Sequence, residues 1–178
     1  MSFTEGSLQL RRQLQARVDR CNGKERGVSE GDLSSRVKGI FAEQLYGVLT
    51  TVNDAGEPHS SIVAFVSADD LRSIVFVTPR NTRKYRYALA RPRVAVFIDD
   101  RRDRVDELMQ VTGIEACGSV EVLARESYGL YRELYLSKHP AMQEFVDAPG
   151  SAIMRIAVER YDVVDRFQHV MVLPPGHE

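Results

Sequence analysis

The spacing of apolar residues changes near residue 47, from a helical to an extended pattern. The helical part contains residues 8–18, an amphipathic helix, and residues 31–46, whose apolar stripe is Val37, Ile40, Phe41 and Leu45. Ser29 precedes Asp32 by three residues, which predicts a capped start for the second helix. We therefore expect a helical N-terminal part ahead of the rest of the fold.

Beyond residue 47, short runs rich in Val, Ile, Thr and Phe alternate with turn residues, a pattern typical of strands. The expected strands are residues 48–53, 57–67, 73–78, 93–99, 109–123 and 152–172. Gly113 and Gly118 mark bends or bulges in the fifth of them. Two helices interrupt the series, residues 82–90 and residues 125–146, the second broken at Pro140. Because regular strand–helix alternation is absent, we expect a mainly β fold, a compact antiparallel barrel with inserted helices.

Composition narrows the class of protein. A chain of 178 residues that is 43% hydrophobic can fill one core, and we divide it into a helical extension, residues 1–30, and a barrel domain, residues 31–178. The net charge of −1 and the pI of about 6.4 argue against general nucleic-acid binding. Cys21 and Cys117 stand far apart, which is typical of unpaired thiols in a reducing compartment. With no apolar signal core and no run of membrane-spanning length, we expect a cytoplasmic protein that does not enter a membrane.

Residues 80–93 hold the strongest functional signal. They include six Lys or Arg residues and no Asp or Glu. The segment follows a predicted strand and opens a predicted helix, so the hydroxyls of Thr78 and Thr82, the free amides of a first helical turn, and the cations Arg83 and Lys84 would meet there. Such a set of donors binds a phosphate group. The alternative is an exposed basic helix that only aids solubility, and the local pattern leaves both open.

Other candidate chemistry is weaker. His59 lies beside two serines in a predicted strand, but no acidic partner stands at a useful spacing, which favours a polar residue near a turn. The chain has neither an H-E-x-x-H nor a G-x-S-x-G motif, so we expect no metal site and no hydrolase of those types. The later helix carries a tyrosine stripe at Tyr128, Tyr131 and Tyr135. That spacing favours a core or dimer contact over ligand stacking.

Five short motifs occur in one order along the chain. They are residues 45–52 (LYGVLTTV), 56–63 (GEPHSSIV), 75–78 (VFVT), 82–84 (TRK) and 91–96 (RPRVAV). Each is weak alone, but in register the chain resembles the FMN-binding split-barrel family, the family of pyridoxamine 5′-phosphate oxidase. The resemblance implies a six-stranded antiparallel Greek-key split barrel and a homodimer with FMN at the subunit interface.

The resemblance also implies cofactor contacts from three parts of the chain, the strand beside the flavin, the segment from Thr78 to Lys84 and the fifth strand. The implied contacts are Ser60, Ser61, Ile62, Val63, Thr78, Thr82, Arg83, Lys84 and Gln110. Of these, Arg83 and Lys84 would bind the FMN phosphate. True pyridoxamine 5′-phosphate oxidases have an arginine and a lysine where this chain has Ser61 and Val66, and a tryptophan that this chain lacks. Arg166 is the nearby candidate for their C-terminal substrate arginine, and vitamin B6 oxidation is not expected.

We therefore expect an FMN-binding, flavin-dependent oxidoreductase that acts on an unidentified small molecule, with no catalytic side chain assigned. The alternatives are a relative that degrades haem or uses a deazaflavin on the same barrel, and a non-enzymatic flavin-binding protein. A nucleic-acid module that stacks bases on Tyr85 and Tyr87 is disfavoured by the overall acidity.

Overall fold

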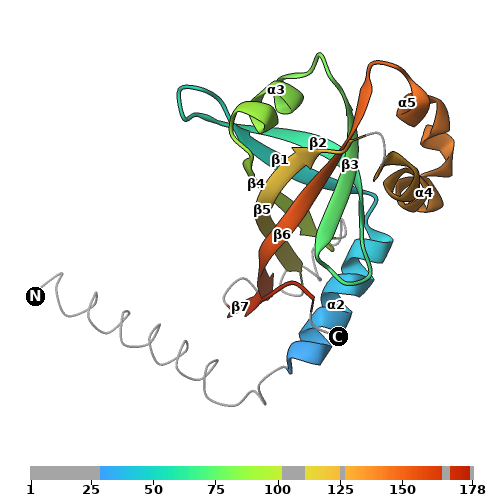
Figure 1. Ribbon diagram of the computed structural model, residues 1–178. Helices are drawn as coiled ribbons and strands as arrows, with labels where there is room; N and C mark the ends of the chain where they lie inside the picture. Colours follow the sequence, from blue (N-terminus) through green and yellow to red (C-terminus); the bar gives the residue numbers. More distant parts are fainter. Residues whose placement is uncertain (1–28, 102–110, 125–126, 166–168, 177–178) are drawn as a thin grey trace, which may run out of the picture.

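The computed structural model describes residues 29–101, 111–124, 127–165 and 169–176 (Figure 1). The helical elements are α2 (Glu30–Glu43), α3 (Arg83–Ala90), α4 (Tyr128–Lys138), the 3-10 helix η3 (Pro140–Met142) and α5 (Gln143–Asp147). The strands are β1 (Tyr46–Val52), β2 (Pro58–Ser67), β3 (Ser73–Pro79), β4 (Arg93–Asp99), β5 (Thr112–Val122), β6 (Ser151–Asp165) and β7 (His169–Leu173).

The strands form one antiparallel sheet in the order β3-β2-β1-β4-β5-β6-β7. A further ladder between β3 and β6 closes β1 to β6 into a barrel, and β7 extends the sheet beyond it (Figure 1). After three consecutive strands, β4 returns to lie beside β1, which is the Greek-key arrangement. The predicted mainly β fold and six-stranded antiparallel barrel are confirmed.

The barrel is split between β2 and β3. β2 pairs with β1 from Pro58 to Ala64, but it pairs with β3 only at Phe65, Val66 and Ser67. Beyond that short ladder, β3 takes its partners from β6 instead, as far as Pro79. Residues 58–64 of β2 therefore have one edge without a strand partner, and the loop to α3 starts from the β3 side of this split.

Residue 118 lies at an irregularity in the long β5–β6 ladder. Cys117 pairs with Arg160 and Gly118 with Val158, so Glu159 is the extra residue of a bulge in β6. A Cβ atom on Gly118 would lie 2.2 Å from the carbonyl oxygen of Ala157, which only glycine avoids. The predicted irregularity at Gly118 is confirmed, whereas the ladder runs without a register shift through Gly113.

Two groups of buried side chains form the interior. The larger one, the barrel core, fills the barrel and includes the apolar face of α2 at Val37, Ile40 and Phe41. The Phe41 ring packs edge-on against Phe65 and Tyr161, with ring centroids 5.5 and 5.8 Å apart. The smaller group, the outer core, lies between the outside of the barrel and the helices α4 and α5 and includes Tyr135, so the core interpretation of the tyrosine stripe holds for that residue.

Two predicted elements were wrong in extent. The helix expected over residues 31–46 ends at Glu43, because the backbone of Gln44 is extended and β1 begins at Tyr46. Leu45 therefore leaves the apolar stripe and is 48% exposed. The single extended segment expected over residues 152–172 is two antiparallel strands, β6 and β7, since Tyr161 to Asp165 pair back with residues 169–173.

The extension predicted over residues 1–30 lies almost entirely outside the described residues, and α2 begins at its last position. None of the helices in the described ranges has the length and apolar character that crossing a bilayer requires. Cys117 is a free thiol, and Cys21 lies outside the described residues.

Candidate functional site

Threonine hydroxyls organise the start of α3 on the β3 side of the split. Thr82 is the N-cap residue, and its Oγ1 accepts a hydrogen bond of 3.4 Å from the backbone amide of Tyr85. The same hydroxyl donates to the carbonyl of Pro79 (2.9 Å) and lies 3.1 Å from Thr78 Oγ1. Thr78 is 1% exposed, so this pair fixes the end of β3 against the first turn of the helix. The predicted hydroxyl pair at the helix start is present.

Lys84 crosses the split. Its Nζ donates a hydrogen bond of 3.0 Å to the carbonyl of Ile62, in the part of β2 that has no β3 partner. Burial lowers the pKa of this ammonium group from its ordinary value, because desolvation disfavours the charged form. Arg83, the neighbouring cation, is exposed and makes no hydrogen bond or ion pair with another described residue. The site therefore presents one anchored and one open positive charge.

The adjoining part of β2 carries polar atoms that the fold leaves unsatisfied. The hydroxyl of Ser61 and Nδ1 of His59 are buried, and neither has a hydrogen-bond partner in the described part of the chain. A buried polar atom without a partner is costly, and in a native protein it often marks a ligand or an ordered water. Both residues face the same side of the strand, because they stand two positions apart.

The remaining predicted contacts differ in how far their side chains are exposed. Ser60 is exposed and lies beside Thr50, with 3.3 Å between their hydroxyl oxygens. The Ile62 side chain is 68% exposed, whereas that of Val63 is buried in the barrel core, so Val63 offers only its backbone to a ligand. Gln110 lies outside the described residues. The structure thus brings Thr78, Thr82 and Lys84 together with the Ser61–Ile62 segment.

His59, for which the sequence favours a polar residue near a turn, also borders the candidate site. Its ring packs edge-on against Tyr87 of α3, with ring centroids 5.6 Å apart, and its buried Nδ1 has no partner among the described residues. The available signal was its spacing: His59 and Ser61 alternate on one strand face, and the basic helix follows the next strand. The sequence alone does not show that the face of β2 with His59 and Ser61 lies next to α3, because this depends on the pairing of β1 with β2 and on the position of α3 in the fold.

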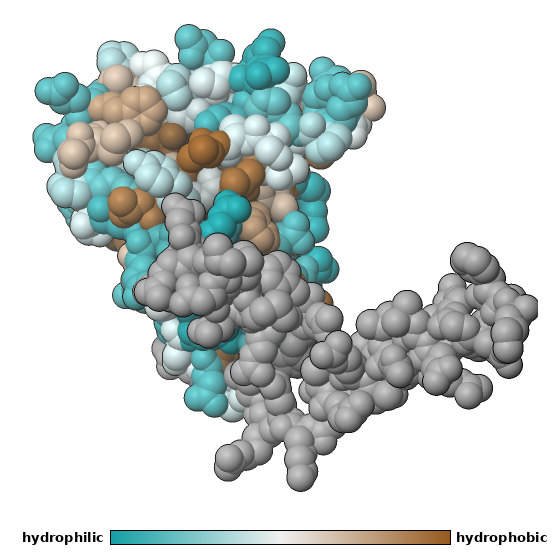
Figure 2. Space-filling model, turned by 180° about the vertical axis from the view of Figure 1, so that it is seen from behind, coloured by the Kyte–Doolittle hydropathy of each residue, from teal (hydrophilic) through white to brown (hydrophobic). Residues whose placement is uncertain are grey.

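The outer face of β1, β2 and β4 is hydrophobic. Tyr46, Ile62 and Phe97 expose much of their side chains there, and Leu45 adjoins them. Tyr46, Ile62 and Phe97 border an open hollow of about 390 Å³ that reaches Asp99 at the end of β4. Figure 2 views the molecule from behind and shows hydrophobic residues gathered on the upper part of that face. The face adjoins the flavin-strand candidates, because Ile62 belongs to both.

Three potential metal ligands also meet on the sheet, which the sequence did not predict. The donor atoms of Glu115, Cys117 and Asp162 lie within 4.8 Å of one another. Arg160 donates a hydrogen bond of 2.9 Å to Asp162, so a guanidinium group already balances part of this negative charge. Burial raises the pKa of the Cys117 thiol, which favours the form that does not bind metal. We assign no metal to this cluster.

The described residues thus form a split antiparallel barrel with a capped, cationic helix beside the open edge of β2. The family model for pyridoxamine 5′-phosphate oxidase matches residues 33–165, and the chain belongs to this family. Among curated proteins, the sequence comparison finds no match.

Solved structures share the fold at low sequence identity. A heme-binding protein from Mycobacterium smegmatis is 17% identical with a TM-score of 0.70, over 79% of this chain and 57% of that one. An FAD-binding protein from Mesorhizobium loti is 18% identical with a TM-score of 0.60, over 73% and 90% of the two chains. HutZ, the heme storage protein from Vibrio cholerae, is 16% identical with a TM-score of 0.60, over 74% and 92%. The chain thus spans little more than half of the M. smegmatis protein.

Proposed function

We propose that this protein binds FMN at the split between β2 and β3 and acts as a flavin-dependent oxidoreductase on a small molecule. One observation carries the proposal: Lys84 spans the split to the Ile62 carbonyl, beside a buried Ser61 hydroxyl that lacks a partner among the described residues. The family membership and an FAD-binding protein among the structures of similar fold support it.

The residues of the site fit a flavin phosphate. The first-turn amides of α3 offer neutral donors, and Arg83 and Lys84 supply positive charge. Thr78 and Thr82 position that turn, with the Thr82 hydroxyl proton used on the Pro79 carbonyl. The unsatisfied hydroxyl of Ser61 offers one more donor. We infer that these groups hold the phosphate and that the backbone of residues 60–63 lies beside the ring. Gln110 remains a predicted contact.

FMN, when bound, supplies two-electron redox chemistry, and the protein's part is to bind it, orient it and leave one side open to substrate. Ser61 and Val66 replace the arginine and lysine of true pyridoxamine 5′-phosphate oxidases. Val66 is buried in the outer core, so that position offers no cation to a substrate phosphate. We therefore propose a substrate other than pyridoxamine 5′-phosphate. Arg166 lies outside the described residues.

We also propose that the active form is a homodimer with FMN at the interface. The hydrophobic face at Tyr46, Ile62 and Phe97 lies next to the candidate flavin strand, and burying such a face against a second copy removes apolar surface from water. A cytoplasmic location stays a prediction.

The first experiment is FMN binding to the Arg83→Ala/Lys84→Ala double variant. We expect its FMN affinity to fall by at least about tenfold, because two charge-assisted contacts are lost. Arg86→Ala, on the exposed side of the same helix, is the matched control and should keep its affinity. Flavin fluorescence quenching measures both. Full retention of FMN by the double variant would refute the site assignment.

Haem is the second candidate ligand, because the proteins of similar structure include a heme-binding protein and a heme storage protein. The exposed rings of Tyr46 and Phe97 beside an apolar hollow favour it here. The visible absorption spectrum of the purified protein separates the cases: flavin bands support FMN and a Soret band supports haem. Reconstitution with a deazaflavin but not FMN would point to that cofactor. Turnover with NADH or NADPH would then distinguish an enzyme from a flavin carrier.

A further inference from the structure

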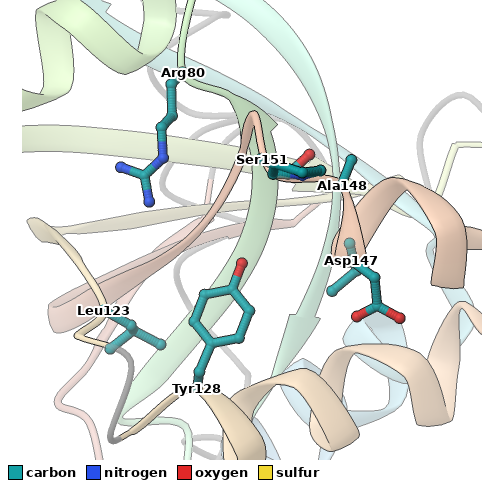
Figure 3. Close-up of a pocket in the computed structure, with 8 residues that line it drawn as sticks. Arg80, Leu123, Tyr128, Asp147, Ala148 and Ser151 are labelled. Atoms are coloured by element: carbon teal, nitrogen blue, oxygen red, sulfur yellow. The ribbon is translucent and has the colours of Figure 1, made fainter.

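A second cavity lies on the opposite side of β3 from β2, outside the barrel. It has a volume of about 350 Å³, within the range of small-molecule sites. Its walls come from the β3–α3 loop, the start of β6, α4 and α5 (Figure 3). The lining residues are Arg80, Leu123, Tyr128, Val146, Asp147, Ala148, Pro149 and Ser151. None of them belongs to the proposed flavin site.

Arg80 gives the cavity a positive charge. Figure 3 shows its guanidinium group and the Tyr128 hydroxyl directed into the same space. One nitrogen of Arg80 donates to the Tyr85 hydroxyl (2.7 Å), and the guanidinium carbon lies 5.6 Å from the centre of that ring. No acidic residue of the described ranges forms an ion pair with Arg80, so its remaining donors are available to a ligand.

The acidic residue of the lining does not cancel that charge. Asp147 accepts two hydrogen bonds of 2.7 Å from Arg132 of α4, in a bidentate pair. These bonds hold the pKa of Asp147 below its ordinary value, so the carboxylate stays charged and paired with Arg132. Arg80 is left as the charge that a ligand in the cavity would meet.

The walls combine apolar surface with an unused hydroxyl. Leu123 and Val146 belong to the outer core, and Tyr128 packs against it. Ser151 also lines the cavity, and its hydroxyl makes no hydrogen bond with another described residue. A hydroxyl can both donate and accept, so it offers a hydrogen bond to a polar group of a ligand there.

The backbone fixes these groups before any ligand arrives. The amide of Arg80 donates to the carbonyl of Gly150 (2.8 Å), and the amide of Ser151 donates to the carbonyl of Ala148 (2.9 Å). Pro79 and Ser151 are paired in the β3–β6 ladder. Because the charge and the hydroxyl sit on one hydrogen-bonded frame, little ordering cost opposes binding.

We propose that this cavity binds a small organic monocarboxylate, with its apolar or aromatic body against Leu123, Tyr128 and Val146 and its carboxylate on Arg80. A guanidinium group matches a carboxylate in charge and geometry. A phosphate ester would need several donors for its oxygens, and the described lining contains one unpaired cation. The proposal does not depend on FMN binding, since no lining residue is among the proposed flavin contacts.

The test is an NMR titration of the full chain with sodium benzoate, with and without FMN. We expect saturable shifts in the amide signals of Leu123, Val146 and Ser151. Arg80→Met keeps the aliphatic stem and should weaken benzoate binding by at least about tenfold, because a hydrogen bond to a charged group is lost. Arg86→Met is the matched control for removing one exposed arginine and should bind benzoate as the parent protein does.

Ser151→Ala is the second variant, and it should weaken binding by about threefold to tenfold without unfolding the chain, since its hydroxyl has no described partner. Equal affinity in Arg80→Met, shifts confined to other surfaces, or no saturation by about 50 mM would overturn the proposal. Displacement of benzoate by FMN would place it in the flavin region, and displacement by inorganic phosphate would refute the carboxylate class.

Discussion

Lys138 shows how one residue can join two helices. Its Nζ lies 2.5 Å from the carbonyl oxygen of Phe41 and 2.6 Å from that of Gln44, at the end of α2. The last turn of α2 has no basic residue of its own, so a side chain of α4 supplies the donors that its free carbonyls require. The same nitrogen lies 4.2 Å above the Phe65 ring.

Lys138 predicts a rise in stability with pH. Burial lowers the pKa of Lys138 from 10.5 to about 8. Between these two values the unfolded chain binds the proton and the folded chain does not, so the folded state gains stability as pH rises through this window. We expect the unfolding free energy of the parent protein, relative to Lys138→Met, to increase from pH 8 to pH 10.5 in urea titrations.

We take the difference in unfolding free energy between the parent protein and Lys138→Met, because the other lysines and tyrosines titrate in both proteins and their contributions cancel. Lys38→Met is the control, because Lys38 of α2 lines the same hollow as Lys138 and the substitution leaves Lys138 in place, so its unfolding free energy should change with pH in parallel with the parent protein. If the difference in unfolding free energy between the parent protein and Lys138→Met does not change with pH, the prediction is wrong, and the two carbonyl contacts offset the burial of the ammonium group.

Residue chemistry predicted part of the site from the sequence. Thr82 and Lys84 could be named as candidates because a hydroxyl followed by cations at a helix start suits an anion, although an exposed basic helix fits the same pattern. The contact that Lys84 makes was not predictable, since its partner is the backbone carbonyl of Ile62, 22 positions away in the sequence. The contact between His59 and Tyr87 was not predictable for the same reason, since only the folded barrel places the two rings beside each other.

At the scale of elements, replacing a glycine by alanine has opposite predicted effects on stability in a tightly paired strand and in an exposed helix. A Cβ at Gly118 would lie 2.2 Å from the Ala157 carbonyl oxygen, whereas one at Gly39 in α2 meets nothing within 4 Å. Gly118→Ala should lower the unfolding free energy by more than about 2 kcal/mol, because the β5–β6 backbone must shift. Gly39→Ala should raise it by about 0.5–1 kcal/mol, the gain of alanine in an exposed helix. Chemical denaturation measures both, and a neutral Gly118→Ala would contradict the close approach.

Element boundaries were predictable where local chemistry marks them. Arg93–Asp99 was predicted at both ends, since Pro92 and the charged run after Asp99 delimit it. The end of α2 was misplaced, because Leu45 continues the helical spacing although the backbone has already become extended. The division of the last extended segment into β6 and β7 was missed, because the extended pattern continues through both strands and only their pairing with each other separates them.

At the scale of the whole molecule, the hydrophobic face predicts assembly. Tyr46→Glu places a charge on the exposed surface of β1 and should shift the proposed homodimer toward monomer, because burying an unpaired carboxylate is costly. Leu130→Glu, on α4, is the matched control, since that residue is 71% exposed and α4 packs against β2, β3 and β6. Sedimentation velocity measures the mass of each. A parent protein that is monomeric at all concentrations would refute the dimer.

Closure of the barrel by β3 and β6 has a consequence for synthesis on the ribosome. β3 emerges early, yet most of its partners belong to β6, near the end of the chain, and until then it has only the short ladder to β2. Contacts between such distant segments form late, because a long loop must close first. The nascent chain would therefore carry an open strand edge through most of translation, and chaperones that shield such edges should engage it before the barrel closes.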